Sequence, residues 1–273
     1  MLSIKLKSRI FLAPMHKVND IAFRILCKKA GAGLVYTGML NPLSKQKIQL
    51  NDKPAVQIFT SSEQRVREFI KKYEKKASLF DLNLGCPSYR ASKHQMGFFL
   101  QDLKVVEKIL KAMKKATQKP ITIKIRKSNQ IKKLVKLAEK YCSAIAIHPR
   151  QGKKDYSYQA DVDFALRIKR RTRLPVIYSG DVNEDNAKKL LEKFDYVMIG
   201  RAAIGNPNIF SKLTGKRINF NFKDYYNLAK KYKLDFEQIK FQAMNFTKGM
   251  KNASKIRQLI SKAKIEKELI SFF

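Results

Sequence analysis

The sequence predicts an α/β protein in which a TIM (β/α)8 barrel is followed by a small all-helical C-terminal domain. From the N-terminus to about residue 210, short apolar, β-branched runs alternate with longer segments of helical period, which is typical of repeated βα units and a parallel sheet. Beyond that point only helical patterns remain. We therefore predict a barrel over residues 1–211, a linker over 212–222 and a helical domain over 223–273.

Eight apolar runs supply the predicted strands, the number that closes a barrel of this type. They are hydrophobic along most of their length, as expected of strands that are buried on both faces. The runs comprise residues 9–15, 34–40, 55–60, 79–86, 121–126, 144–148, 175–180 and 196–200.

Helical periodicity fills most of the intervals between these runs. Apolar residues at i, i+3 and i+4, with polar residues opposite, predict barrel helices over 62–76, 103–117, 129–141, 163–171 and 184–194. Residues 41–54 are polar and lack a clear helical period, so we expect a long loop or a short irregular helix there. In the tail, the same periodicity predicts three helices over 224–233, 235–248 and 254–273.

The composition favours a soluble protein with a polyanionic partner. No apolar run reaches the roughly 18 residues of a membrane span. The N-terminus lacks a long hydrophobic region followed by a cleavage site, so we expect a cytoplasmic location and no membrane contact. The formal net charge of +36 at pH 7 favours nucleic acid through counterion release. A compositional bias toward lysine is an alternative source of this charge, because basic residues are as dense over 221–273 as elsewhere.

The chain has 3 cysteines at wide spacing and 3 histidines, which suggests neither a disulfide framework nor a metal site. Cys27 and Cys142 lie in or at the end of helical segments, where we expect buried thiols. Cys86 instead ends a strand, and Pro87 favours a turn that presents its side chain at the mouth of the barrel. A free thiol is mostly protonated at neutral pH, so Cys86 could give a proton to a developing carbanion.

Polar residues end nearly every predicted strand. Because the active site of such a barrel lies at the C-terminal ends of its strands, we expect them to converge on one mouth. They are Met15-His16, Gln57, Cys86, Lys124 with Arg126, His148 with Arg150, Ser179-Gly180-Asp181 and Gly200-Arg201. The last two strands end where many barrels bind phosphate, which indicates a phosphorylated cofactor. Tight turns beside a surface arginine would have the same local sequence.

Several motifs occur in order along the predicted strands: Ala13-Pro14-Met15, the segments 20–24 and 83–87, Lys124-Ile125-Arg126, Gly180-Asp181 and the segment 198–203. Together they resemble the FMN-dependent tRNA-dihydrouridine synthase family. The tail segment 246–257 is similar to the closing helices of that family's tRNA-binding domain. The resemblance implies a TIM-barrel enzyme that reduces the C5–C6 double bond of specific uridines in tRNA, with no stable protein partner.

The resemblance also implies roles for individual residues. FMN would lie along Pro14, Met15 and His16, with Gln57, Lys124 and His148 at its polar edge and its phosphate on Ser179, Gly180, Asp181, Gly200 and Arg201. Cys86 would protonate uracil C5 while reduced flavin N5 delivers hydride to C6, and Asn83 would face the base. Lys124 would favour the anionic reduced flavin. The sequence has no dinucleotide-binding glycine fingerprint, so NADPH or NADH would bind only transiently as reductant.

Two basic segments are candidates to hold the tRNA backbone while a uridine is drawn out of its stack. The loop after Cys86 carries Tyr89, Arg90 and Lys93, and the tail carries Lys251, Lys255 and Arg257. We also assign Arg150 to the substrate. For the tail, ordinary solvated surface lysines are an equally good interpretation.

The chain departs from the family pattern at four places. Pro149 and Gln151 flank Arg150 where the family commonly has His-Gly-Arg-Thr, Ser179 replaces an asparagine, Gly38 replaces a glutamate, and the glycine that often follows the third strand is absent. Two other function classes fit part of the pattern. An FMN barrel that acts on a small pyrimidine would not need the basic tail, and an RNA-binding protein without catalysis would not hold a flavin.

Overall fold

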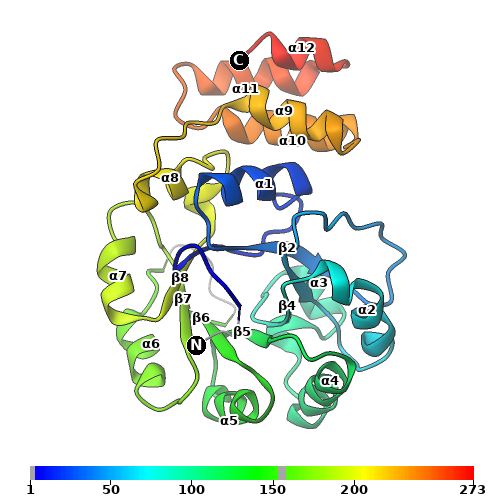
Figure 1. Cartoon of the computed structure of the whole chain (residues 1–273), viewed down its shortest axis with the longest axis vertical. Helices are drawn as coiled ribbons and strands as arrows, with labels where there is room; N and C mark the ends of the chain where they lie inside the picture. The colour runs from blue at the N-terminus through cyan, green and yellow to red at the C-terminus, as the bar shows by residue number, and fades with distance from the viewer. Residues whose placement is uncertain (1–3, 153–157) are drawn as a thin grey trace.

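A computed structural model describes residues 4–152 and 158–273. Its centre is a closed barrel of parallel strands in sequential order, with β8 pairing back to β1 (Figure 1). The strands are β1 (Ile10–Leu12), β2 (Leu34–Leu40), β3 (Ala55–Ile58), β4 (Leu79–Leu84), β5 (Ile121–Lys127), β6 (Ala144–Gln151), β7 (Val176–Ser179) and β8 (Tyr196–Ile199). The predicted barrel is confirmed. Several strands end before the apolar run does, because the chain has already turned into the loops of the mouth.

Helices surround the barrel, and each of the five predicted barrel helices is present with shifted ends. They are α2 (Val66–Tyr73) with the 3-10 turn η1 (Glu74–Lys76), α4 (Leu103–Ala116), α5 (Ile131–Tyr141), α6 (Val162–Lys169) and α7 (Ala187–Lys193). Three shorter elements lie in the mouth loops: α3 (Tyr89–Lys93), η2 (Gly97–Phe99) and η3 (Arg201–Ala203). Residues 41–54 form neither helix nor strand, as expected.

The helix α1 (Ile21–Ala30) is absent from the helices that the periodicity predicts. One part of its surface contacts β2 and another contacts a tail helix, so most of its residues are buried. A helix that is covered on two sides has no broad polar face, so its sequence lacks a clear amphipathic pattern. The buried Arg24 on this helix forms a salt bridge of 2.7 Å with buried Asp52 and donates to the carbonyl of Gln49, which anchors the 41–54 loop.

The tail consists of α9 (Phe222–Lys231), α10 (Phe236–Phe246), α11 (Ala253–Lys262) and α12 (Glu266–Ile270). The prediction of one helix over 254–273 is wrong, because the chain is extended around Ala263 and Ile265. The Glu268 carboxylate accepts hydrogen bonds from the backbone N–H groups of Lys264 and Ile265, which starts a new helix. The helix α8 (Ile209–Thr214) also extends into the predicted linker. No helix within the described residues is long and apolar enough to cross a membrane.

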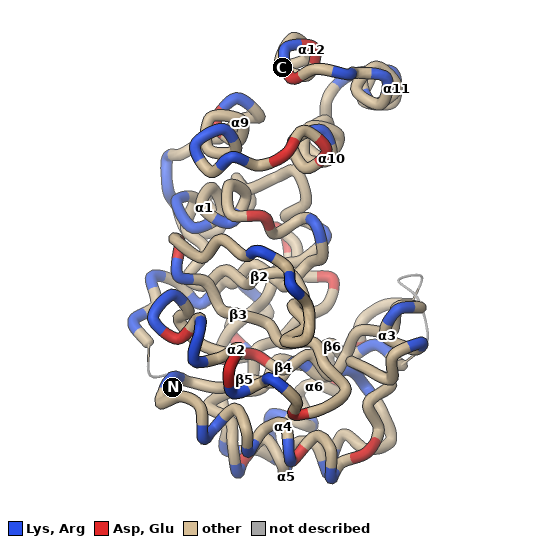
Figure 2. Tube along the Cα trace, turned by 90° about the vertical axis from the view of Figure 1, so that its right-hand side faces the viewer, with Lys and Arg blue, Asp and Glu red and all other residues tan. Residues whose placement is uncertain are grey.

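The tail packs against α1, as Figures 1 and 2 show. Phe222, Tyr225 and Phe246 belong to the same continuous core as Phe23 of α1. The rings of Phe23 and Phe246 meet edge to face, with centroids 6.4 Å apart. The division of the chain into separate catalytic and tRNA-binding domains therefore stays a prediction, since the two parts share buried surface.

The barrel interior is divided between an apolar layer and a polar layer. Aromatic rings fill the end where the strands begin, with Phe11 and Tyr196 stacked at a centroid distance of 5.0 Å. Toward the opposite end the buried residues are polar, including Gln57, Asp81 and Thr122, each with 0% exposure. Buried polar groups are tolerated only when they are hydrogen-bonded. The polar layer therefore indicates that the candidate site lies at the C-terminal ends of the strands.

Candidate active site

Cys86 lies just beyond the C-terminal end of β4 and is half-buried. The side-chain oxygen of Asn83 accepts hydrogen bonds from the backbone N–H groups of Gly85 and Cys86, both at 3.0 Å. The sulfur lies 3.3 Å from the Ser88 hydroxyl oxygen. On the other side, Gly97 has a φ of +58°, and a side chain there would lie 2.9 Å from the Cys86 carbonyl. The thiol is thus held in a tight, partly exposed turn.

Asn83 connects this turn to the polar layer of the barrel. Its amide nitrogen donates to the Gln57 side-chain oxygen at 2.9 Å, and the Gln57 amide donates to Asp81 at 2.7 Å. Thr122 donates to the other oxygen of the Asp81 carboxylate at 2.5 Å. Burial raises the pKa of Asp81 to about 6, against the opposing effect of these hydrogen bonds. A continuous hydrogen-bonded chain therefore runs from the barrel centre to Cys86.

Lys124 pairs in register with Asn83, so its side chain enters the mouth beside the thiol turn. Burial lowers the pKa of Lys124 to about 8, although the carboxylate of Asp81 opposes that shift. The ammonium makes no hydrogen bond or ion pair with the residues that the structure describes. A half-buried cation in this state has its donors available for a ligand.

His148 is a neutral imidazole in the second half of β6. Burial lowers its pKa to about 2, and the charges of Lys124, Arg126, Arg150 and Arg201 add to the shift. Arg150 Nη1 lies 2.9 Å from His148 Nε2. Because a guanidinium can only donate, Nε2 must accept, and we assign the remaining proton to Nδ1. The side chain can therefore donate one hydrogen bond from Nδ1 without carrying charge.

The loops after β7 and β8 are joined by Asp181, whose carboxylate accepts from both Arg150 and Arg201. Burial raises the pKa of Asp181, but hydrogen bonds from Arg150 and the Ala160 N–H and the charge of Arg201 outweigh burial and lower it overall. Asp181 has a φ of +50°, a conformation unusual for a residue with a side chain. This geometry favours an indirect role for Asp181, in which it orients two guanidinium groups toward an anion.

Pro14, Met15 and His16 follow β1 and enter the same mouth. A Cβ at Gly38 would lie 3.3 Å from the Met15 carbonyl oxygen, so glycine lets this loop lie directly against β2. A side chain at Gly200 would lie 3.7 Å from the Ala13 Cβ and 3.9 Å from the Met15 sulfur. The predicted ring-binding loop and the predicted phosphate loop are therefore neighbours, as one cofactor would require.

The residues assigned to tRNA lie at the surface. Tyr89, Arg90 and Lys93 are exposed on α3, and burial followed by the charge of Arg90 lowers the pKa of His16. Lys251, Lys255 and Arg257 are exposed in the tail. In Figure 2, α3 and α11 both lie on the side of the molecule away from the N-terminus. Lys255 and Arg257 are two residues apart on one helix, so they lie on different faces of it.

Arg150 differs from the other tRNA candidates because it is buried, with 3% exposure. Its guanidinium is already shared by Asp181, His148 and the Tyr158 carbonyl. These partners make Arg150 a link between the segment after β6 and the loop after β7. Its assignment to the substrate rests on the sequence alone.

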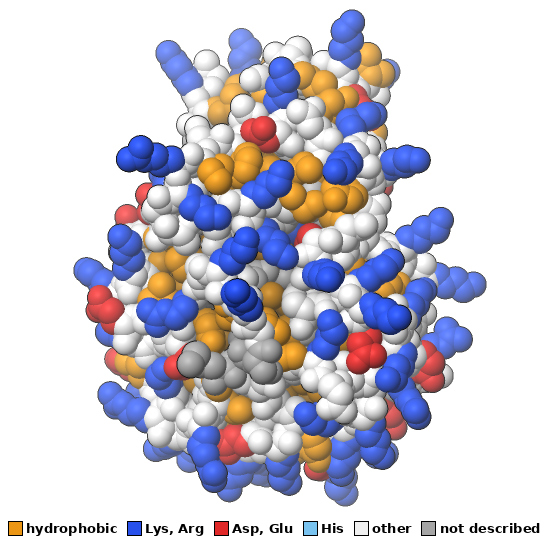
Figure 3. Space-filling view, viewed as in Figure 1, with side chains coloured by type: hydrophobic (Ala, Val, Ile, Leu, Met, Phe, Trp, Pro, Cys, Tyr) orange, Lys and Arg blue, Asp and Glu red, His pale blue; other side chains and the backbone are white. Residues whose placement is uncertain are grey.

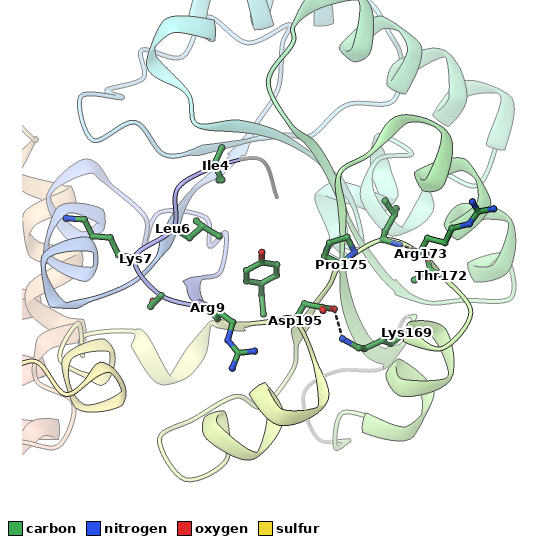
Figure 4. Close-up of a pocket in the computed structure, with 12 residues that line it drawn as sticks. Ile4, Leu6, Lys7, Arg9, Lys169, Thr172, Arg173, Pro175 and Asp195 are labelled. Atoms are coloured by element: carbon green, nitrogen blue, oxygen red, sulfur yellow. Dashed lines mark hydrogen bonds and ion pairs between the residues drawn. The ribbon is translucent and has the colours of Figure 1, made fainter. Parts of the chain in front are cut away.

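Neither the charge distribution nor the cavities alone locate the site. Lysine and arginine side chains are spread over both barrel and tail on the face seen in Figure 3. A cavity of about 780 Å³ lies where the strands begin, beside Arg9, Pro175 and Tyr196 (Figure 4). A smaller cavity of about 500 Å³ adjoins Gly180 and Asp181. In barrels of this type the starting ends of the strands serve stability, so the mouth remains the candidate site.

Asp81 and Thr122 belong to the hydrogen-bonded chain behind Cys86, although no sequence motif indicates them. Each is a polar side chain between two apolar residues of its strand: Asp81 lies between Phe80 and Leu82, and Thr122 lies between Ile121 and Ile123. That alternation places Asp81 and Asn83 on one face of the strand, here the barrel interior. An acidic residue between two apolar residues of a buried strand was the available signal for Asp81.

Fold and site together define a (β/α)8-barrel protein with a thiol, an ammonium and a neutral imidazole at the catalytic end of its strands. Among solved structures, morphinone reductase in complex with tetrahydroNAD superposes with a TM-score of 0.57 at 12% identity, covering 82% of this chain and 91% of that one. A mutant of (S)-mandelate dehydrogenase gives 0.53 at 10% identity, covering 84% and 81%. At these identities the similarity shows the fold alone.

The sequence comparisons are more specific. A family model described as "Dihydrouridine synthase (Dus)" matches residues 11–271. A "Probable tRNA-dihydrouridine synthase" of Rickettsia bellii is 34% identical over 234 residues, covering 77% of this chain and 72% of that protein. A "tRNA-dihydrouridine synthase B" of Pasteurella multocida is 33% identical over 230 residues, covering 76% and 69%. The chain belongs to the dihydrouridine synthase family, which confirms the resemblance inferred from its motifs.

Proposed function

We propose that this protein is a flavin-dependent oxidoreductase that reduces the C5–C6 double bond of specific uridines in tRNA. The observation that carries the proposal is the position of Cys86. Asn83 holds the backbone of the turn that carries this thiol, at the same end of the barrel as Lys124 and His148, in a chain of this family. The names of the relatives favour tRNA over the alternative of a small pyrimidine.

FMN is the flavin that the residues fit best. The available ammonium of Lys124 and the Nδ1–H of His148 suit the polar edge of an isoalloxazine ring. The guanidinium groups of Arg150 and Arg201 converge on Asp181, beside glycines that allow close approach of a phosphate. When bound, FMN supplies the hydride, and NADPH or NADH would restore its reduced state.

The protein's own groups bind, orient and protonate the substrate. A uridine extruded from the tRNA would lie between the cofactor and Cys86, whose sulfur gives a proton to C5. Asn83 fixes the turn that carries the sulfur. The exposed basic residues of α3 and the tail, Arg90, Lys93, Lys251, Lys255 and Arg257, would hold the surrounding phosphates.

The proposal is tested with the purified protein, NADPH or NADH, and either unmodified tRNA transcripts or free uridine monophosphate. We expect bound FMN after purification and dihydrouridine in the tRNA, with the free nucleotide unchanged. Reduction of the free nucleotide without reaction of tRNA would support the small-pyrimidine alternative. Binding of tRNA by a protein that holds no flavin would support a binding role without catalysis.

A further inference from the structure

The tail helix α10 is hydrogen-bonded to the loop that follows β1. Gln242 has 0% exposure, and its amide donates to the Val18 carbonyl and to the Asp20 carboxylate, each at 2.7 Å. Asp20 is the N-cap of α1, and its other oxygen accepts from the Phe23 N–H at 2.9 Å. Tyr225 of α9 also donates to Asp20, at 3.2 Å. One carboxylate of the barrel is therefore held mainly by the tail.

The neighbouring Gln238 extends this contact toward the mouth. Its amide donates at 2.9 Å to the Lys17 carbonyl and at 2.9 Å to Asp20. Lys17 has a φ of +61°, which is unfavourable for a residue with a side chain. A strained backbone of this kind persists only where its surroundings fix it. Backbone hydrogen bonds from Val18 to His16 and from Asn19 to Met15 hold this loop from within the barrel, and the tail adds the bond to the carbonyl of Lys17 itself, the residue that directly follows His16.

The C-terminal end of α10 reaches the loop that follows β8. Lys248, just after the helix, donates to the Arg201 carbonyl at 3.2 Å. At Gly205, with a φ of +67°, an added Cβ would lie only 1.9 Å from the Asn245 carbonyl oxygen, so the two backbones are in close contact. The same helix thus touches both the loop of His16 and the loop of Gly200 and Arg201.

We infer that α10 is a strut that fixes the two cofactor loops of the barrel, with Gln238 and Gln242 as positioning residues for flavin binding. This inference rests on the proposed function, because it needs a flavin between these loops. Without the strut, each loop populates conformations that cannot bind, and the apparent affinity falls by the competent fraction. By linkage, flavin binding must stabilise α10 in return.

The test compares Gln242→Met and Gln238→Met with Gln258→Met, the same change at an exposed position of α11. Methionine keeps the length of the side chain and removes the donor. FMN is titrated into each apoprotein by fluorescence, and amide hydrogen exchange of α10 is followed with and without FMN. We expect FMN affinity to fall about tenfold in the first two variants and to match the unmodified protein in the third.

In the unmodified protein, FMN should slow exchange in α10 and leave unchanged the outer helix α4, which does not pack against α10. If Gln238→Met and Gln242→Met bind FMN with normal affinity, the inference is overturned. A lower melting temperature in these variants would then show that both residues act only in stability. If Gln242→Met does not fold, the half-buried Gln238 carries the test alone. An unmodified protein that binds no FMN would reject the proposed function itself, which distinguishes the two failures.

Discussion

The side-chain oxygen of Asn83 lies 3.0 Å from the backbone nitrogen of Cys86, while the amide of Asn83 reaches back 2.9 Å to Gln57. One side chain thus joins the turn that carries the thiol to the buried polar layer of the barrel. Catalysis by a positioned acid depends on such support, because a displacement of about 1 Å can cost roughly 100-fold in rate.

Replacing Asn83 should therefore impair turnover more than cofactor binding. We expect Asn83→Ala to lower kcat about 100-fold with FMN retained, because the N–H groups of Gly85 and Cys86 lose their acceptor. Asn83→Asp keeps that acceptor but replaces the donor to Gln57 with a carboxylate oxygen, so it should retain more activity than Asn83→Ala and less than the unmodified protein. Steady-state kinetics with tRNA check both variants, and an Asn83→Ala enzyme of normal kcat would contradict the positioning role.

Flavin binding should weaken at alkaline pH. Because the pKa of Lys124 is about 8, its ammonium is charged at pH 7 and loses its proton as the pH rises through that value. We expect the Kd for FMN to rise between about pH 7 and 9. In Lys124→Met the Kd should be higher and independent of pH over this range. A Kd for FMN that stays constant to pH 9 in the unmodified protein would remove Lys124 from cofactor binding.

Asp81 should make the protein less stable as the pH rises. Its folded pKa of about 6 lies above the ordinary value of 3.8, so the folded state binds the proton more tightly. The free energy of unfolding should therefore fall between about pH 4 and 6, by up to about 3 kcal/mol. Asp81→Asn should remove that slope. Urea unfolding of both proteins across this pH range measures the free energy of unfolding. If this free energy changes with pH in the same way in the unmodified and Asp81→Asn proteins, Asp81 does not cause the change.

Charges in the tail should contribute to tRNA affinity through phosphate contacts. We expect the triple change of Lys251, Lys255 and Arg257 to glutamine to weaken tRNA binding. The slope of log K for tRNA binding against log salt concentration should become shallower by up to about 0.9 per lost phosphate contact. The matched control changes Lys132, Lys133 and Lys136 on α5, which are also exposed. Equal losses in both proteins would indicate a general charge effect. Substitution is preferable to deletion here, because α9 and α10 cover α1.

The sequence alone predicted the elements with strong local patterns. Buried strands such as β8 (Tyr196–Ile199) are continuous apolar runs, and a surface helix such as α4 shows its period plainly. The helix α1 was not predicted from its periodicity, because tertiary packing covers two of its sides. The break between α11 and α12 could not be predicted from the periodicity. The cap from Glu268 depends on local geometry, and the apolar period continues across the break.

Part of the candidate site could likewise be predicted from local sequence patterns, and part depends on tertiary contacts. Cys86 follows β4, and Lys124 and His148 lie in the second half of β5 and β6, so barrel geometry alone gathers them toward one mouth. The contact between Gln242 and Val18 joins residues 224 positions apart, and no local pattern encodes such a pairing. The close approach of α10 to the cofactor loops could therefore be found only in three dimensions.

The central claim is that the Cys86 sulfur protonates the uridine, and a single-turnover experiment tests it most directly. Unmodified and Cys86→Ala proteins, both loaded with FMN and reduced without oxygen, are mixed with unmodified tRNA, and dihydrouridine is measured over time. We expect equal FMN content and a loss of about 10²- to 10⁴-fold in the rate of dihydrouridine formation for Cys86→Ala. Equal rates in the two proteins would contradict the account.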